Sequence, residues 1–302
     1  MLISVIICAY SMSRYHDLAE AISSLIGQSA EKEVILVIDR NEELHRLAVS
    51  ELGGNGVRVL LSKSPGLSSG RNLGLSSARG DIVAFMDDDA VAGDGWLAAL
   101  EGAFADPNVV VAGGTIKPMW LGNRKGWMPN SFMWVVGCTG LDEPENGEEV
   151  RNAFGSNIAF RKAALVEAGG FSGNLGRVDE RQSTSEEVSA CIAVKRNNPL
   201  AKIIHVRGAE VSHRVYASRA TPAFYLRRAY GEGASKAKLR KILSSGSKNE
   251  GLSKEIPYLM KTMTDSRDTS GAKNLIALFV SWGLTASVAM GFFSGRWRGP
   301  HD

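Results

Sequence analysis

Short apolar runs alternate with segments of helical periodicity through the first third of the chain. The apolar runs are rich in β-branched residues and predict strands at residues 2–9, 34–38, 57–61 and 81–86. Apolar residues at helical spacing predict intervening helices at residues 18–25, 42–52, 68–78 and 96–104. Strands that alternate with helices of this length indicate an α/β fold, with a Rossmann-like, mostly parallel sheet and flanking helices.

The pattern changes after the fourth predicted helix. Residues 109–159 are irregular and rich in Gly, Trp and Met, which indicates active-site loops and short strands. The remaining elements predicted before residue 218 are a helix at 162–168, a mobile loop at 169–185, a helix at 186–195 and one or two strands over 203–211 that reach His213.

The composition suits one large globular domain with an extension, since the chain has 302 residues, of which 44% are hydrophobic and 22% charged. Cys8, Cys138 and Cys191 lie far apart and are odd in number, which argues against a disulfide framework and a CxxC zinc site. A reducing cytosol fits this usage. No basic segment precedes the first apolar strand and no cleavage site follows it, so we expect no signal peptide and a cytoplasmic catalytic part.

Polar residues follow the predicted strands at the edge where open parallel sheets bind ligands. They are Tyr10, Asp39 and the triplet Asp87-Asp88-Asp89. Adjacent carboxylates repel one another, so the triplet indicates a bound cation, and Mg²⁺ or Mn²⁺ bridging a diphosphate supplies that charge. The alternative is a solvated turn or helix N-cap, a role that Asp94 shares. We expect Asp89 at an exposed strand end.

Several motifs follow one another in an order that resembles the family 2 glycosyltransferases. They are Ser4-Val5-Ile6-Ile7-Cys8-Ala9-Tyr10, then Asp39, Gly66-Leu67-Ser68-Ser69-Gly70-Arg71-Asn72, Ala78-Arg79-Gly80-Asp81 and Phe85-Met86-Asp87-Asp88-Asp89-Ala90. The resemblance spans residues 3–230 and implies the A-type glycosyltransferase fold. Ser11-Met12-Ser13-Arg14 departs from the family's usual Asn-Arg.

The resemblance implies a nucleotide-sugar donor of the uridine type. It assigns donor contacts to Ala9, Tyr10, Asp39, Arg71, Asn72, Asp87, Asp88, Ser156 and Asn157. Asp39 would accept from the base, Arg71 would hold the base or phosphate side, and Asn157 would bond sugar hydroxyls. Asp87 or Asp88 would reach the ribose. A helix cap at Asp39, a surface ion pair at Arg71 and a turn role for Asn157 are the alternatives.

The resemblance also implies a divalent metal, Mg²⁺ or Mn²⁺, as cofactor. Asp89 would bind it, and His213 would complete the metal site or contact the diphosphate. A histidine on a strand is also commonly a structural residue, and this alternative stays open.

The catalytic base is expected in the pair Glu186-Glu187, with Glu187 preferred. An inverting transfer needs one carboxylate to take the acceptor proton while metal and basic groups carry the leaving diphosphate. Acids in the first turn of a helix also complement its dipole without any chemistry. Ser189 and Ala193 stand where relatives often have an acid and an arginine, so a catalytically impaired nucleotide-sugar-binding scaffold is the alternative function.

Three other enzyme classes do not fit the motifs. A sugar-nucleotide pyrophosphorylase would need a Gly-rich loop with Arg and Lys after the first strand, where the chain has Tyr10-Ser11-Met12-Ser13. A haloacid-dehalogenase-type phosphatase needs its aspartates after that strand, and a dinucleotide oxidoreductase needs GxGxxG there.

The C-terminal part is expected to be a basic, helical, membrane-associated extension. We place a catalytic domain at 1–218 and the extension at 219–302, since residues 219–261 hold ten basic and three acidic residues. No nucleic-acid motif accompanies this charge, so an anionic membrane surface is the expected partner. Residues 219–237 resemble a subgroup that includes lipid-linked-oligosaccharide and archaeal hexuronosyl transferases, which implies a polyprenyl-phosphate-linked acceptor.

Residues 274–295 carry no charge and are the expected membrane contact. Roughly 20 apolar residues span a bilayer, and Lys273 and Arg296-Trp297-Arg298 flank the segment. A surface-lying helix and a packed or oligomer-contact helix are the alternatives. If the segment spans the bilayer or lies on its surface, the enzyme works at the cytoplasmic face of the cell membrane. The donor sugar, the acceptor, the metal preference and the oligomeric state are left open by the sequence.

Overall fold

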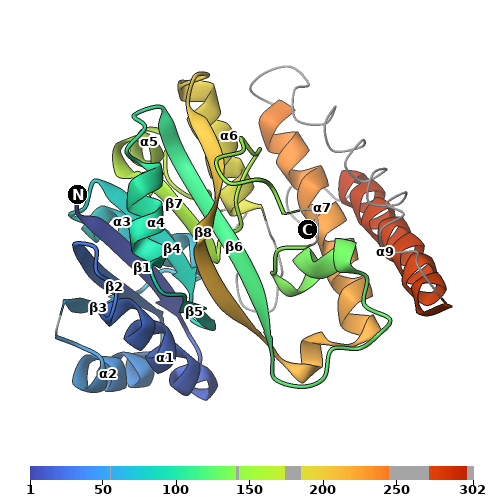
Figure 1. Ribbon diagram of the computed structural model, residues 1–302, viewed down its shortest axis with the longest axis horizontal. Helices are drawn as coiled ribbons and strands as arrows, with labels where there is room; N and C mark the ends of the chain where they lie inside the picture. Colours follow the sequence, from blue (N-terminus) through green and yellow to red (C-terminus); the bar gives the residue numbers. More distant parts are fainter. Residues whose placement is uncertain (55, 141–142, 174–184, 245–271, 298–302) are drawn as a thin grey trace. The chain divides into compact units, whose positions relative to one another are not determined.

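The computed structural model describes residues 1–54, 56–140, 143–173, 185–244 and 272–297 (Figure 1). The chain divides into two compact units. Unit 1 consists of Met1–Lys117, Pro144–Arg181 and Glu186–Arg214, and unit 2 of Pro118–Glu143, Gln182–Ser185 and Val215–Asp302. This division groups the segment 118–143 with the C-terminal part, and the boundary after residue 218 stays a prediction. Most of the expected loop at 169–185 lies outside the described residues.

A mixed, eight-stranded sheet has the order β3-β2-β1-β4-β7-β6-β8-β5. Its strands are β1 (Ile3–Ala9), β2 (Lys32–Asp39), β3 (Val57–Ser62), β4 (Ile82–Asp87), β5 (Ala90–Ala92), β6 (Val109–Trp120), β7 (Asn157–Arg161) and β8 (Lys202–Val215). The strands β3, β2, β1 and β4 are parallel, as the sequence predicts. β7 runs antiparallel to β4 and β6, and β5 runs antiparallel to β8. The α/β, Rossmann-like fold class is confirmed, with an antiparallel half beside the parallel one.

Helices connect and cover the strands of unit 1. They are η1 (Met12–Arg14), α1 (Tyr15–Ile26), α2 (Glu42–Glu51), α3 (Leu67–Ser77), α4 (Trp96–Ala103), α5 (Lys162–Glu167) and α6 (Glu186–Asn197). Side chains on the strands alternate between the two faces of the sheet. Ile6 of β1, Val37 of β2 and Phe85 of β4 point into one buried cluster with Leu75 of α3. The residues next to each of them in its strand face the other side of the sheet.

The prediction of loops and short strands over 109–159 is wrong at its start, where β6 is a strand of 12 residues. A Cβ at Gly114 would lie 1.7 Å from the Ala209 carbonyl oxygen, and one at Gly113 would lie 2.0 Å from the Ala153 Cβ. The glycines that make this segment irregular in sequence are therefore required by the close approach of neighbouring chain segments.

Helix α3 lies directly on β1. A Cβ at Gly74 would lie 2.5 Å from Ile6 Cγ2, and one at Gly70 would lie 3.1 Å from Cys8 Sγ. Two glycines one turn apart thus let the helix backbone approach the strand closely. Since α3 carries Arg71, this contact fixes the height of Arg71 above the sheet.

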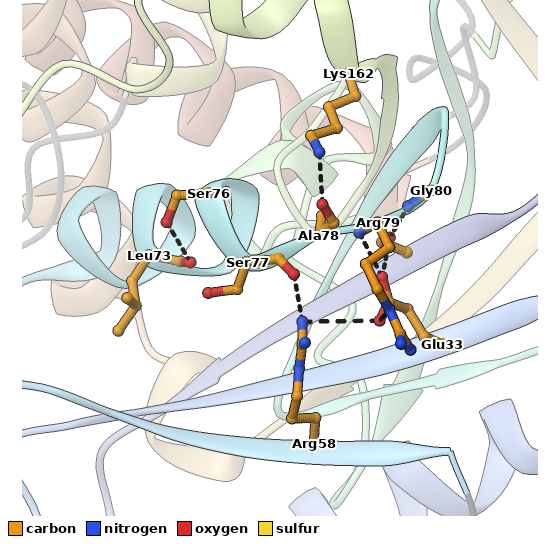
Figure 2. Close-up of polar contacts among 10 residues, drawn as sticks. Glu33, Arg58, Leu73, Ser76, Ser77, Ala78, Arg79, Gly80 and Lys162 are labelled. Atoms are coloured by element: carbon orange, nitrogen blue, oxygen red, sulfur yellow. Dashed lines mark hydrogen bonds and ion pairs between the residues drawn. The ribbon is translucent and has the colours of Figure 1, made fainter.

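Basic side chains hold the C-terminal end of α3 (Figure 2). Arg58 Nη2 donates to the Ser77 carbonyl oxygen, and Lys162 Nζ donates to the Ala78 carbonyl oxygen. The last carbonyls of a helix lack intrahelical donors and carry partial negative charge, so cations stabilise them.

A buried carboxylate lies beside this helix end. Glu33 is 4% exposed and accepts from Ser4 Oγ at 2.7 Å and from the backbone N and Nε of Arg79 at 2.6 and 2.9 Å. Arg58 Nη2 lies 3.7 Å from its Oε2. Burial raises the pKa of Glu33, but the hydrogen bonds from Ser4 and Arg79 outweigh it and lower the pKa. We call Ser4, Glu33, Arg58 and Arg79 the Glu33 cluster.

Unit 2 contains η2 (Asn130–Val136), η3 (Ala217–Arg219), α7 (Pro222–Ser244) and α9 (Ala272–Trp297). α7 and α9 pack at backbone distance, since a Cβ at Gly233 would lie 1.9 Å from the Val288 carbonyl oxygen. A Cβ at Gly291 would lie 1.9 Å from the Tyr230 carbonyl oxygen. In the described part of the chain, no helix combines the length and apolar character of a membrane span.

The side of α9 turned away from α7 exposes large apolar residues. We call this set the α9 apolar face, and it consists of Ile276, Phe279, Trp282, Met290 and Phe293, each more than half exposed. Ala277, Leu284 and Val288, which are interspersed with them along the helix, are buried.

Candidate active site

The aspartate triplet lies at the carboxyl end of β4. Asp87 is the last residue of β4, and Asp88 and Asp89 form the turn that leads into β5. β5 pairs with β8 so that Ala90 lies opposite His213. This pairing places His213 Nε2 3.1 Å from Asp89 Oδ1. The short strand β5 thus brings a histidine from late in the chain to the triplet.

Asp87, Asp89 and His213 form a group that fits a divalent metal. One ligand atom from each of the three lies within 4.8 Å of the other two. Two carboxylates and an imidazole form a donor set that ions such as Mn²⁺ accept, and the usual coordination number leaves positions for diphosphate oxygens. From the sequence, Asp87 or Asp88 is expected to reach the ribose, and the structure makes Asp87 a candidate metal ligand as well.

The expectation of an exposed strand end is wrong for Asp89. Asp88 and Asp89 are only 4% and 2% exposed, whereas the Asp87 side chain is 34% exposed. The turn is covered because β8 packs on β5 and because η1 lies over the triplet with Arg14. Buried carboxylates are costly unless cations or hydrogen-bond donors meet them, so this burial strengthens the case for a cation site.

Arg14 is a residue of this site that the sequence analysis missed. Its Nη1 lies 3.0 Å from Asp88 Oδ1 and 3.2 Å from Asp89 Oδ2. The guanidinium also lies over the ring of Tyr10, with its Cζ 5.1 Å from the ring centroid. In the sequence Arg14 stands out only as part of the departure from the family's first motif, and that departure was the available signal.

Arg71 connects the triplet to the acidic pair. Its Nη1 lies 3.1 Å from Glu186 Oε1, and its Nη2 donates to the Gly155 carbonyl oxygen at 2.8 Å. Nη2 also lies 3.5 Å from Asp87 Oδ1. The Arg71 side chain is 4% exposed, which excludes a surface ion pair. Burial alone would lower the pKa of Arg71, but Glu186 and Asp87 raise it, so the guanidinium stays charged.

Glu186 and Glu187 open α6 and have different surroundings. Glu186 is 5% exposed and its carboxylate is engaged by Arg71. Glu187 is half-buried, so part of it is open to solvent, and its charge also acts on Arg71. The structure thus separates a buried acid that contacts Arg71 from a neighbouring acid that is partly open to solvent.

Two expected donor contacts are engaged by the fold itself. Asn157 is fully buried, its Oδ1 accepts from Trp96 Nε1 at 2.9 Å, and its Nδ2 donates to the carbonyl oxygens of Thr115 and Ala209. The amide therefore joins α4, β6 and β8 beside the site.

Asn72 is engaged in a similar way. It exchanges two hydrogen bonds with the backbone of Phe171, at 2.8 and 2.9 Å. Ser156, next to Asn157, is 6% exposed. These placements favour a positioning role for the two amides.

Asp39 does not cap the next helix, α2, which has its own N-cap in Asn41. The Asp39 Oδ2 instead accepts from the backbone N of Gly66, the N-cap residue of α3, at 2.9 Å. Ala9 is 2% exposed, while Tyr10 at the strand end is 52% exposed. The ring of Tyr10 is thus available to a ligand at the edge of the sheet.

Cys8 lies on β1 close to Arg71 and the triplet. Burial raises the pKa of its thiol to about 12, and the nearby carboxylates of Asp87 and Asp88 add to this effect. The thiol therefore stays protonated near neutral pH. Carboxylates, rather than a thiolate, are the available bases here.

Comparison with known proteins identifies the class of enzyme. The model of the family described as Glycosyl transferase family 2 matches residues 4–169. A glucosyl-dolichyl phosphate glucuronosyltransferase of Haloferax volcanii is 31% identical over 306 residues, which cover 98% of this chain and 96% of the relative. These two matches, together with the group Asp87, Asp89 and His213 at the edge of the sheet, show that the chain is a glycosyltransferase. More particularly, the chain belongs to glycosyl transferase family 2.

Solved structures share the fold. A mannosyltransferase of Pyrobaculum calidifontis, in complex with GDP-Man and Mn²⁺, has a TM-score of 0.61 at 15% identity, over 98% of this chain and 87% of its own. Residues 1–349 of S. aureus TarS, in complex with UDP-GlcNAc, give 0.53 at 17% identity, over 98% and 90%. The A-type glycosyltransferase fold expected from the motifs is therefore confirmed.

Proposed function

We propose that this enzyme is an inverting, metal-dependent glycosyltransferase that moves a sugar from a UDP-sugar donor to a lipid-linked acceptor. The observation that carries the proposal is the group Asp87, Asp89 and His213, whose ligand atoms lie within 4.8 Å of one another at the carboxyl edge of the parallel strands. A divalent metal held there would neutralise the charge that develops on the leaving diphosphate.

The acidic pair supplies the remaining chemistry. Glu187 would take the proton from the acceptor hydroxyl or phosphate as the acceptor oxygen bonds to the sugar C1. The bond from C1 to the diphosphate oxygen breaks on the opposite face, which inverts the anomeric configuration. Glu186 would hold Arg71 in place, and Arg71 would present its positive charge toward the donor phosphates. Asp39, Ala9 and Tyr10 would line the base and ribose pocket.

The lipid-linked acceptor is supported by the named relative, whose acceptor is a glucosyl-dolichyl phosphate. A polyprenyl-phosphate-linked acceptor would bring the reaction to a membrane surface. The α9 apolar face suits this location, because aromatic and aliphatic side chains on one side of a helix insert at the headgroup boundary. Exposed Arg227 and Lys238 on α7 would add attraction to anionic lipids, about 1 kcal/mol for each residue near the surface.

A donor assay tests the transfer reaction. Release of nucleoside diphosphate is measured for several UDP-sugars and for GDP-mannose, with Mn²⁺, with Mg²⁺ and with EDTA, in the presence of glycosylated polyprenyl phosphate. We expect release from a UDP-sugar that EDTA abolishes, and a product whose anomeric proton coupling shows inversion. Donor binding without release from any of these donors would favour the scaffold function instead.

Vesicle sedimentation tests the membrane location separately. We expect the full-length protein to sediment with vesicles of anionic lipid and to remain unbound with neutral ones at physiological salt. The double variant Phe279→Ser, Trp282→Ser should lose most of this binding. Leu200→Ser, which changes an 83% exposed apolar residue on unit 1, is the matched control and should bind like the wild type. Equal binding by all three proteins would exclude the α9 apolar face as the contact.

A further inference from the structure

Arg14, the last residue of η1, stands at an electrostatically unfavourable position at the start of α1. It is the N-cap residue of α1 and makes no side-chain cap hydrogen bond. The N-terminus of a helix carries partial positive charge and favours anions, so a guanidinium there needs compensation from elsewhere. The carboxylates of Asp88 and Asp89, at 3.0 and 3.2 Å from Nη1, provide it.

Arg14 and the metal-ligand group share one carboxylate. Asp89 directs Oδ2 toward Arg14 and Oδ1 toward His213, at 3.2 and 3.1 Å. Asp89 is also one of the three residues whose ligand atoms lie within 4.8 Å of one another. Asp88, by contrast, contacts Arg14 and is not a member of that group. A divalent ion on Asp89 would therefore lie close to a guanidinium that is itself only 16% exposed and poorly screened by solvent.

We propose that Arg14 is a counter-ion built into the site, which neutralises Asp88 and Asp89 before the metal binds and lowers the affinity for the metal alone. This inference rests on the metal dependence in the proposed function. The two cations repel each other across one carboxylate, so binding of the free ion is opposed. The negative diphosphate of a donor offsets that repulsion, so the metal binds tightly only together with a nucleotide.

Titration of Mn²⁺, followed by the electron paramagnetic resonance signal of the free ion, tests the inference without turnover. In the absence of nucleotide, Arg14→Gln should bind Mn²⁺ about tenfold more tightly than the wild type, because one positive charge has been removed next to the ion. Arg14→Lys keeps the charge and should stay close to the wild type. Addition of UDP should tighten binding more in the wild type than in Arg14→Gln.

Two controls make the result specific. Arg79→Gln removes an arginine from the Glu33 cluster, which holds no residue of the metal-ligand group, and should leave Mn²⁺ affinity unchanged. Thermal unfolding of each variant reports whether the fold is retained. If Arg14→Gln does not fold, the double variant Arg14→Gln, Asp88→Asn restores the charge balance, and it should bind Mn²⁺ more tightly than Asp88→Asn alone.

Unchanged or weaker Mn²⁺ binding by folded Arg14→Gln, beside measurable binding by the wild type, would overturn the counter-ion role and leave the metal site standing. No Mn²⁺ binding by any variant, with or without UDP, would overturn the metal site and this inference with it.

Discussion

Two polar clusters in unit 1 differ in how far their buried carboxylates are compensated by cations and hydrogen-bond donors. In the Glu33 cluster, one carboxylate accepts from Ser4 and Arg79, and Arg58 lies nearby (Figure 2). At the other end of the parallel strands, the triplet and the pair Glu186-Glu187 place five carboxylates around Arg14, Arg71 and His213. In the first cluster the single carboxylate finds all its donors and cations within the cluster, and the second cluster carries an excess of negative charge.

This difference separates a structural role from a functional one. A satisfied buried carboxylate fixes the elements around it, as Glu33 does for the start of β2 and the segment after α3. An excess of carboxylates raises the free energy of the folded state until a cation binds. The excess therefore indicates a site for a ligand from solution, and variants of the two clusters should affect different measurements.

The largest effect is expected for Asp89→Asn. The change removes the charge that a metal needs and keeps the shape of a residue that is 2% exposed. We expect metal-dependent transfer to fall about a thousandfold, or ~4 kcal/mol. The melting temperature should stay close to that of the wild type, since the lost ion pair with Arg14 is offset by less repulsion within the triplet and Asp88 still pairs with Arg14. Steady-state kinetics at saturating Mn²⁺ together with calorimetry check this, and near-normal activity would remove Asp89 from the metal site.

Glu187→Gln should have the next largest effect. The amide preserves shape but cannot take the acceptor proton, so kcat should fall about a hundredfold or more while the donor still binds. Isothermal titration with a UDP-sugar and single-turnover kinetics separate the two steps. Glu186→Gln is the matched variant, and it should instead lower stability because Arg71 loses its closest carboxylate. An active Glu187→Gln beside an inactive, fully stable Glu186→Gln would move the base by one residue.

Glu33→Gln should give the converse result. Its side chain accepts three hydrogen bonds, and an amide NH₂ in their place would face donors. We expect a loss of about 1–3 kcal/mol in the free energy of unfolding, with kcat nearly unchanged. Urea denaturation measures the first quantity and the transfer assay the second. A stable variant with impaired catalysis would contradict the division between the clusters.

The smallest effect concerns acid stability. The pKa of Glu33 is lower in the folded protein than its ordinary value, so its ionised form stabilises the fold. That contribution is fully present above the unfolded pKa, about 4.3, and is lost as pH falls through the lower folded pKa. The difference in the free energy of unfolding between the wild type and Glu33→Gln should therefore become smaller below about pH 4. Denaturation midpoints at pH 7 and pH 3 check this, and a constant gap would refute it.

The sequence predicted the parallel half of the sheet because each strand there is a continuous apolar run between clear turn and helix signals. It missed β6, because the glycines that suggested a loop are required by distant neighbours such as Ala209, which no local pattern reveals. It also identified Asp89 and His213 through motifs, but not their burial, which depends on the pairing of β5 with β8. Arg14 was missed for a related reason, since its partners are 74 and 75 residues away.

Atomic radii, rather than charges, set the spacing between α3 and β1, because Gly74 leaves no room for a side chain against Ile6. Such a contact is insensitive to ionic strength, whereas the attraction of Arg14 and Arg71 for anions is screened by dissolved ions. Concentrated salt would therefore weaken the attraction of these arginines for an anionic ligand well before it altered the packing of α3 on β1. The parallel half of the sheet would keep its spacing to α3 at high salt concentration.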